Sequence, residues 1–122
     1  MPDLIVYVDR FTVAEGKLED LRRYCEKMAK LVEDKEPGTI ACNYFVDEDG
    51  KTGTAVLVFE SEEALDAHLD VAGHLFQEAV PLLDSSSIEL LGPASDQAQQ
   101  VTRKFGGAIK SNVLAGFARS TP

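Results

Sequence analysis

The sequence predicts an α+β fold in which strands and helices follow one another in the order βαββαβ. Three observations support this prediction: apolar β-branched runs alternate with amphipathic helical stretches, an acidic turn joins two of the runs, and the strands are apolar on both faces. That order of elements is the ferredoxin-like arrangement, an antiparallel four-stranded sheet with both helices on one face.

A change of hydrophobic period separates the first strand from the first helix. Residues 4–13, LIVYVDRFTV, are rich in β-branched and aromatic side chains and end before a glycine-containing turn. From Lys17 onward, apolar residues recur every three or four positions with charged residues between them, as in an amphipathic helix. Pro37 should end this helix near Lys35, because proline has no backbone N–H to donate.

The remaining core elements are a hairpin, a second helix in two pieces and a fourth strand. Residues 39–46 and 54–60 flank an acidic, glycine-containing turn, which indicates a β-hairpin. The second helix follows, and Gly73 interrupts it before a second helical piece over residues 74–83. Residues 86–92 then supply the fourth strand.

The composition of the strands predicts self-association. In the first strand, one face holds Tyr7 and Phe11 while the other holds Val6 and Val8, and the third strand is apolar on both faces too. Strands of this kind are covered on both sides, but two helices cover only one. A second copy of the chain is the expected cover, because soluble monomers rarely expose large apolar patches and homodimers are the commonest oligomers.

Residues 1–93 are expected to form the core domain, and residues 94–122 a C-terminal extension. Within the extension, residues 96–104 can form a short polar helix, followed by Gly106 and Gly107. The remaining stretch is mainly small and apolar, which does not fit a solvated linker. We expect it to pack across a partner subunit or to cap the end of the dimer.

Composition excludes several classes of function. The chain of 122 residues fits one domain, and its formal charge of −9 makes nucleic acid an unexpected partner because it repels phosphate backbones. No run approaches the roughly 18 apolar residues of a membrane span, and the N-terminus lacks the basic start of a signal peptide. Cys25 and Cys42 do not make a disulfide framework, so we expect reduced thiols and a cytoplasmic protein.

Three stretches share motifs with a known family: RFTVAEGKLEDLR at 10–22, EPGTIACNYF at 36–45 and FESEEALDAHLDVAGHLFQEA at 59–79. The motifs are a Gly-Lys helix start, a Glu-Pro-Gly turn and a Glu-Ala-x-x-x-His segment. In this combination the chain resembles the antibiotic biosynthesis monooxygenase family, within the dimeric α/β barrel superfamily. The resemblance implies a homodimeric barrel of two back-to-back sheets, with a pocket in each subunit between its helices and its own sheet.

The resemblance also implies a chemistry. Some relatives oxygenate phenols or quinols without metal or flavin, and others bind and degrade haem. We therefore expect a cofactor-independent monooxygenase acting on a small phenol- or quinol-type aromatic, with no cofactor and no metal. Haem binding or degradation and a non-catalytic, dimeric ligand-binding domain are the alternatives. Several active relatives use a tryptophan in the pocket, but this chain has none. The missing tryptophan counts against both the monooxygenase and the haem hypothesis.

His68 and Asp9 are the expected catalytic residues, because cofactor-free oxygenation needs a group that takes the substrate's proton in a dry pocket. His68 lies on the apolar stripe of the second helix, and imidazole titrates near neutral pH. A core histidine satisfied by one hydrogen bond is the alternative. Asp9 interrupts an apolar strand and could accept a proton or orient His68. Its alternative is an ion pair with an arginine: Arg10, Arg22 or Arg23.

Six residues are candidates for contact with the substrate: Tyr7, Asn43, Tyr44, Phe59, His74 and Phe76. Asn43 and Tyr44 are neighbours on one strand, so they face opposite ways and only one can line a given pocket. The aromatic candidates could wall an aromatic site, with plain core packing as their alternative. Metal binding is not expected, because a glycine breaks the helix among the possible ligands Asp70, His74 and Glu78.

Overall fold

The computed structural model describes residues 4–119. Residues 1–3 of the predicted core domain and residues 120–122 of the predicted extension lie outside the described residues. Its strands are β1 (Ile5–Val13), β2 (Thr39–Val46), β3 (Thr52–Phe59), β4 (Leu83–Leu91) and β5 (Ala108–Lys110). Its α-helices are α1 (Leu18–Lys35), α2 (Glu62–Ala72), α3 (Phe76–Ala79) and α4 (Asp96–Lys104). None of the helices in the described part of the chain is long and apolar enough to cross a membrane.

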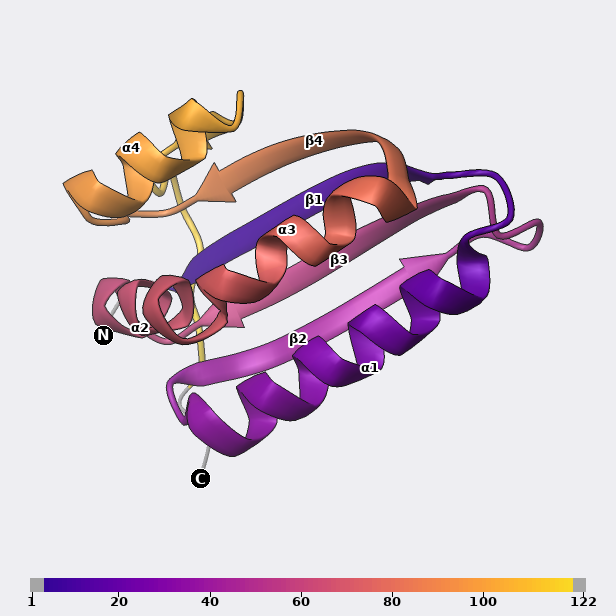
Figure 1. Ribbon diagram of the computed structural model, residues 1–122. Helices are drawn as coiled ribbons and strands as arrows, with labels where there is room; N and C mark the ends of the chain where they lie inside the picture. Colours follow the sequence, from indigo (N-terminus) through magenta and orange to yellow (C-terminus); the bar gives the residue numbers. More distant parts are fainter. Residues whose placement is uncertain (1–3, 120–122) are drawn as a thin grey trace.

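The strands form one sheet in the order β2-β3-β1-β4-β5 (Figure 1). β1 is antiparallel to both β3 and β4, and Tyr7 stands opposite Leu57 on one side and Leu90 on the other. β2 and β3 form the predicted hairpin, and Thr52 Oγ1 donates a hydrogen bond of 2.6 Å to Asp47 Oδ2 across its turn. The predicted α+β class and the βαββαβ order of the core are confirmed.

The sheet differs from the prediction in two places. It has a fifth strand, β5, which pairs parallel to β4, so the sheet is mixed and not a purely antiparallel four-stranded one. Three residues are too few for an alternation of period two to be recognised in the sequence. β4 also begins at Leu83 and not near residue 86, because its polar, serine-rich start still pairs with the end of β1.

One face of the sheet carries α1, α2 and α4 (Figure 1). Side chains of one parity point toward these helices and form the buried core: Ile5, Phe11, Ala55, Leu57, Phe59 and Leu90. From α1, the apolar stripe contributes Leu21, Met28 and Val32. The core therefore lies between the sheet and a single layer of helices.

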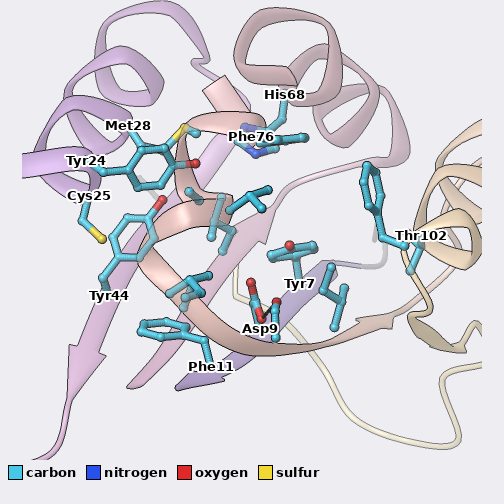
Figure 2. Close-up of a pocket in the computed structure, with 18 of the residues that line it drawn as sticks. Tyr7, Asp9, Phe11, Tyr24, Cys25, Met28, Tyr44, His68, Phe76 and Thr102 are labelled. Atoms are coloured by element: carbon cyan, nitrogen blue, oxygen red, sulfur yellow. Dashed lines mark hydrogen bonds between the residues drawn. The ribbon is translucent and has the colours of Figure 1, made fainter. Parts of the chain in front are cut away.

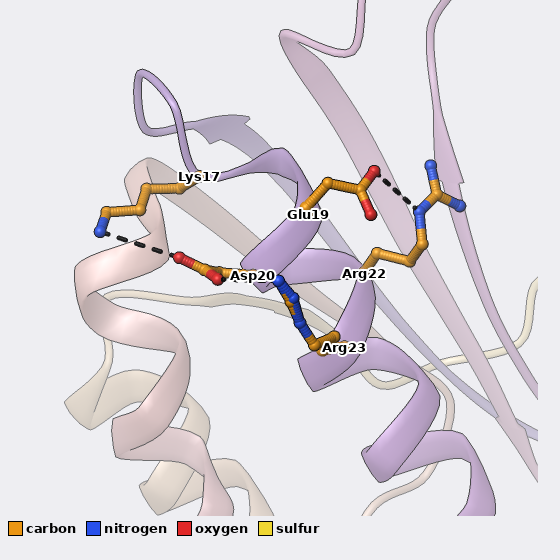
Figure 3. Close-up of polar contacts among 5 residues, drawn as sticks. All are labelled: Lys17, Glu19, Asp20, Arg22 and Arg23. Atoms are coloured by element: carbon orange, nitrogen blue, oxygen red, sulfur yellow. Dashed lines mark hydrogen bonds and ion pairs between the residues drawn. The ribbon is translucent and has the colours of Figure 1, made fainter.

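The first turn of α1 is a surface feature (Figure 3). Asp20 pairs with Lys17 at 3.8 Å and with Arg23 at 3.6 Å, and Arg22 pairs with Glu19 at 3.2 Å. Such exposed pairs contribute little to stability, although the two acidic residues also face the positive end of the helix dipole. Both arginines are thus occupied at the surface.

The second helical region is irregular after α2. Ser61 caps α2, its Oγ accepting a hydrogen bond of 3.1 Å from the Ala64 backbone N–H. From Gly73 the chain continues as short 3₁₀ turns on both sides of α3, and the last of these contains Pro81. The predicted second helical piece is present, but it ends at Leu82 because Leu83 already belongs to β4.

The opposite face of the sheet has no helix over it in the described part of the chain (Figure 1). Val6, Val56 and Val58 lie on it only partly buried, and Phe45 is 56% exposed. Cover by a second copy of the chain stays a prediction. Apolar side chains near the C-terminus also remain exposed: Val113, Leu114 and Phe117.

Candidate functional site

A cavity of about 380 Å³ lies between the helices and the sheet (Figure 2). Side chains from β1, β2, β3 and β4 form its floor, while α1, α2, α3 and α4 provide its walls. Most of the lining is aliphatic or aromatic, with a few polar groups among it. This combination is typical of sites for small ligands.

His68 enters this cavity from α2 and is held by a buried carboxylate. Its Nδ1 lies 2.9 Å and 3.1 Å from the two carboxylate oxygens of Glu36, which ends α1. The His68 and Glu36 residues are only 6% and 3% exposed. Thr39 Oγ1 donates a further hydrogen bond of 2.9 Å to Glu36 Oε1, which fixes the carboxylate in place.

The pair with Glu36 leaves the other nitrogen of His68 available. Burial lowers the pKa of His68, and the nearby Glu36 carboxylate opposes this effect without overcoming it. The ring is therefore neutral at pH 7, with its proton on Nδ1 donated to Glu36. Among residues 4–119, the side-chain hydrogen bonds of His68 are made by Nδ1 to Glu36, which leaves Nε2 without a side-chain partner. Nε2 is a free proton acceptor on a cavity-lining residue.

All the tyrosines of the chain, Tyr7, Tyr24 and Tyr44, line the same cavity. In Figure 2 the hydroxyls of Tyr24 and Tyr44 both point toward the interior of the cavity, and Tyr7 lies beside Asp9. Burial raises the pKa of Tyr24 to about 12, and it raises the pKa values of Tyr7 and Tyr44 as well. The three phenols remain protonated at neutral pH and can donate hydrogen bonds to an anionic ligand.

Asp9 lies at the floor of the cavity, and its partner is not the one expected. Ser86 Oγ donates a hydrogen bond of 2.6 Å to Asp9 Oδ1. Glu36, not Asp9, orients His68, and the alternative ion pair of Asp9 with an arginine is not formed either. The role of Asp9 as a proton acceptor stays a prediction. Burial raises the pKa of Asp9, while its hydrogen bonds to residues of β4 oppose the rise. Asp9 remains a second titratable group in the cavity, on the sheet side.

The arginines considered for Asp9 bind other carboxylates: Arg10 pairs with Glu89 across the sheet, and Arg22 and Arg23 pair within α1.

The structure divides the six predicted substrate contacts into two groups. Tyr7, Tyr44 and Phe76 line the cavity. Phe59 is fully buried in the core and does not line the cavity, but its ring centroid lies 5.4 Å from that of His68. The centroid of the Phe76 ring lies 5.9 Å from that of His68, so two aromatic rings lie near the imidazole.

Asn43 and His74 lie outside the cavity. Asn43 is exposed on the uncovered face of the sheet, as expected for the neighbour of an inward-facing Tyr44, and it borders a separate depression beside α1. His74 is exposed because it belongs to the 3₁₀ turn after α2, where the helical spacing that would bring it inward is lost. Residues 4–119 contain no cluster of three or more potential metal ligands.

Glu36 and Tyr24 were not predicted as site residues. Tyr24 follows Leu21 by three positions and precedes Met28 by four, so the spacing of the α1 stripe could have placed it inward. Glu36 was assigned only to the turn after the first helix. Its contact with His68 spans 32 positions of sequence, and nothing local distinguishes it from a surface glutamate.

The sequence profile described as antibiotic biosynthesis monooxygenase matches residues 4–79, more than half of the chain. The chain belongs to the antibiotic biosynthesis monooxygenase family. The matched residues contain His68, Glu36, all the tyrosines and Asp9, so most of the cavity lies within the family domain. No curated protein sequence matches the chain.

Several solved structures share the fold of this family member. MupZ from Pseudomonas fluorescens has a TM-score of 0.80 and 21% identity, with 95% of this chain and 94% of that chain covered. A Shewanella oneidensis protein has a TM-score of 0.63 and 29% identity over 74% of this chain and 90% of its own. The cofactor-independent oxygenase SnoaB from Streptomyces nogalater, in mutant form, has a TM-score of 0.63 and 21% identity over 72% and 90%.

Proposed function

We propose that this protein is a cofactor-independent monooxygenase that oxidises a small phenol- or quinol-type aromatic. The observation that supports this most directly is the buried Glu36–His68 pair, which leaves His68 Nε2 as a proton acceptor at an apolar cavity. Membership of the family and the likeness in fold to a cofactor-independent oxygenase agree with the proposal.

The proposed reaction begins with proton transfer. The hydroxyl of the substrate gives its proton to Nε2 of His68, and Glu36 stabilises the imidazolium that forms. The hydroxyls of Tyr7, Tyr24 and Tyr44 can hold the resulting anion by hydrogen bonds. The apolar lining strengthens these interactions because it excludes water.

The substrate itself supplies the electrons. The electron-rich anion passes one electron to dioxygen, and the two radicals combine into a peroxide at a ring carbon. Loss of the hydrogen on that carbon breaks the O–O bond, which leaves a carbonyl oxygen on the ring and releases the second oxygen atom as water. For a phenol the balance is one phenol and one dioxygen to one quinone and one water, and the proton held by His68 leaves with that water.

Oxygen uptake tests the proposal. An oxygen electrode with a panel of phenols and hydroquinones should show enzyme-dependent consumption, and His68→Ala should reduce kcat by about 10²-fold to 10⁴-fold, the usual contribution of a general base. His74→Ala is the matched control, because that histidine is exposed outside the cavity. Unchanged turnover in His68→Ala would contradict the assignment.

Two outcomes would replace the proposal with an alternative. Thermal stabilisation by quinones or phenols without any oxygen uptake or product would indicate a non-catalytic binding domain. A Soret shift on titration with haem would instead favour haem binding. The apolar lining of the cavity fits a bound ligand with or without catalysis, so oxygen uptake is the measurement that separates the first alternative from the proposal.

We also infer that the protein works as a homodimer in which two sheets pack through the faces that carry no helix. Val6, Val56 and Val58 make this face apolar, and a second copy presents the same surface by symmetry. Such packing would leave the cavity of each subunit on the opposite, helical side of its own sheet. Partner and substrate would then bind to different faces.

A further inference from the structure

The C-terminal extension forms one wall of the cavity that contains His68. Ala98, Val101, Thr102 and Phe105 line it, and all of them belong to α4 or follow it directly. The helix packs against α2, which carries His68, and over β4. A segment outside the family match therefore borders the proposed reaction site.

This wall is fixed at both ends. At its start, Ser95 caps α4 by accepting a hydrogen bond of 3.1 Å from the Ala98 N–H, and it donates one of 2.7 Å to Asp66 on α2. At its end, the Gly107 N–H donates a hydrogen bond of 2.9 Å to the Thr102 carbonyl before β5 joins β4. A Cβ at Gly107 would lie 2.5 Å from Thr102 Cγ2, so this close approach needs glycine.

The wall is apolar although it contains a threonine. Thr102 Oγ1 donates a hydrogen bond of 2.8 Å to the Ala98 carbonyl within the helix, so its hydroxyl is already occupied. Val101 adds a branched aliphatic side chain. Phe105 lines the cavity and is nevertheless 61% exposed, which places its ring at the mouth. The shape of this wall can therefore select among ligands, but the wall offers few groups that could form hydrogen bonds to them.

The extension also distinguishes this chain from shorter members of the fold. The Shewanella oneidensis protein and SnoaB match 74% and 72% of this chain with 90% of their own length, so those chains are shorter than this one. MupZ covers 95% of this chain, which includes most of the extension. The α4 wall thus lies outside the part of the chain that the family profile matches.

We propose that α4 is a specificity element that limits the size of the substrate. In this proposal Val101 limits the depth of the cavity and Phe105 narrows its opening. The ligand class is a fused-ring hydroxyaromatic whose hydroxyl faces His68 and whose apolar end lies against α4. A cavity of about 380 Å³ is at the lower end of the range for pockets that bind drug-sized ligands, so a change in one wall should change which ligands fit. The position of the hydroxyl rests on the proposed function, but the size limit does not.

Binding of a graded series under anaerobic conditions tests this proposal without turnover, because the proposed reaction consumes dioxygen. Calorimetry would give the Kd of phenol, 1-naphthol and 1-anthrol for the full chain and for Val101→Ala, Val101→Leu and Phe105→Ala. One methylene in an apolar pocket usually changes discrimination about 10-fold or more. Val101→Ala should therefore shift the ratio of Kd values about 10-fold in favour of the larger probe, and Val101→Leu should shift it the opposite way. Phe105→Ala should weaken discrimination among the probes.

Gln100→Ala is the control, because Gln100 is exposed on the same helix. Thermal melts identify any variant that fails to fold, and the exposed Phe105 provides a substitution that does not touch the core. The proposal is overturned if all three variants leave the ratios within twofold of Gln100→Ala. If the ratios of Kd values shift as expected but no oxygen is consumed, the proposed role of α4 stands and the proposed oxygenase activity is rejected. The two failures are therefore distinguishable.

Discussion

At the scale of single residues, the partner of His68 decides what the site can do. A neutral imidazole with Nδ1 bound to a carboxylate keeps Nε2 as a base, whereas a fully satisfied histidine would only be part of the core. Glu36 acts through His68 and is a positioning residue.

Glu36→Gln should lower kcat and should also move the acid limb of the pH–rate profile to lower pH. The reason is that the Glu36 charge raises the pKa of His68 against the effect of burial, so its removal leaves burial alone. A pH series of oxygen uptake would measure the shift. Glu33→Gln, an exposed position of the same helix, is the control, and an acid limb that stays in place would show that Glu36 only supports the fold.

The same pair makes stability depend on pH. The pKa of His68 is lowered in the folded protein from an ordinary value of 6.5, so below pH 6.5 the unfolded chain binds more protons than the folded one. His68 therefore contributes its full stability above pH 6.5, and this contribution is lost as the pH falls toward the folded pKa. Urea titrations between pH 5 and 7.5 should show a steeper loss for the wild type and His74→Gln than for His68→Gln. Parallel curves for all three proteins would contradict the assignment.

At the scale of elements, the four core strands followed from their apolar, β-branched runs, and α1 followed from its helical period. Residues 39–46 were predicted at the bounds they have in the structure, and residues 96–104 form the predicted helix. β5 was not predicted, because three residues are too few to show an alternation of period two. His74 was predicted inside the cavity because the helical spacing of α2 was extended across a 3₁₀ turn. The local sequence pattern therefore identified His68 and Tyr7 as cavity residues. Glu36 could not be identified in this way, because its role depends on a contact between the end of α1 and α2.

Gly53 on β3 tests how tightly the sheet packs. A Cβ there would lie 2.5 Å from the Phe45 carbonyl oxygen and 2.6 Å from the Phe11 ring. Gly53→Ala should therefore lower the free energy of unfolding by about 1–3 kcal/mol, the usual cost of overpacking. Gly73→Ala is the matched control: it has helical φ and no atom within 4 Å of a Cβ, so it should raise stability by about 0.5–1 kcal/mol. Chemical denaturation measures both, and equal effects of the two substitutions would contradict the packing argument.

At the scale of the whole molecule, the two apolar faces of the sheet differ in what packs against them. The helices bury one, and the structure describes no helix over the valines of the other (Figure 1). If a second copy covers that face, sedimentation at micromolar concentration should give about twice the chain mass of 13.3 kDa.

Val58→Lys places a charge at the centre of the proposed contact and should give monomers, because an unpaired charge is costly to bury. Glu33→Gln changes the net charge equally on the exposed side of α1 and should leave the dimer intact. A folded single chain for the wild type would refute the sheet-to-sheet dimer, while the cavity, which is built from one chain, would keep its lining.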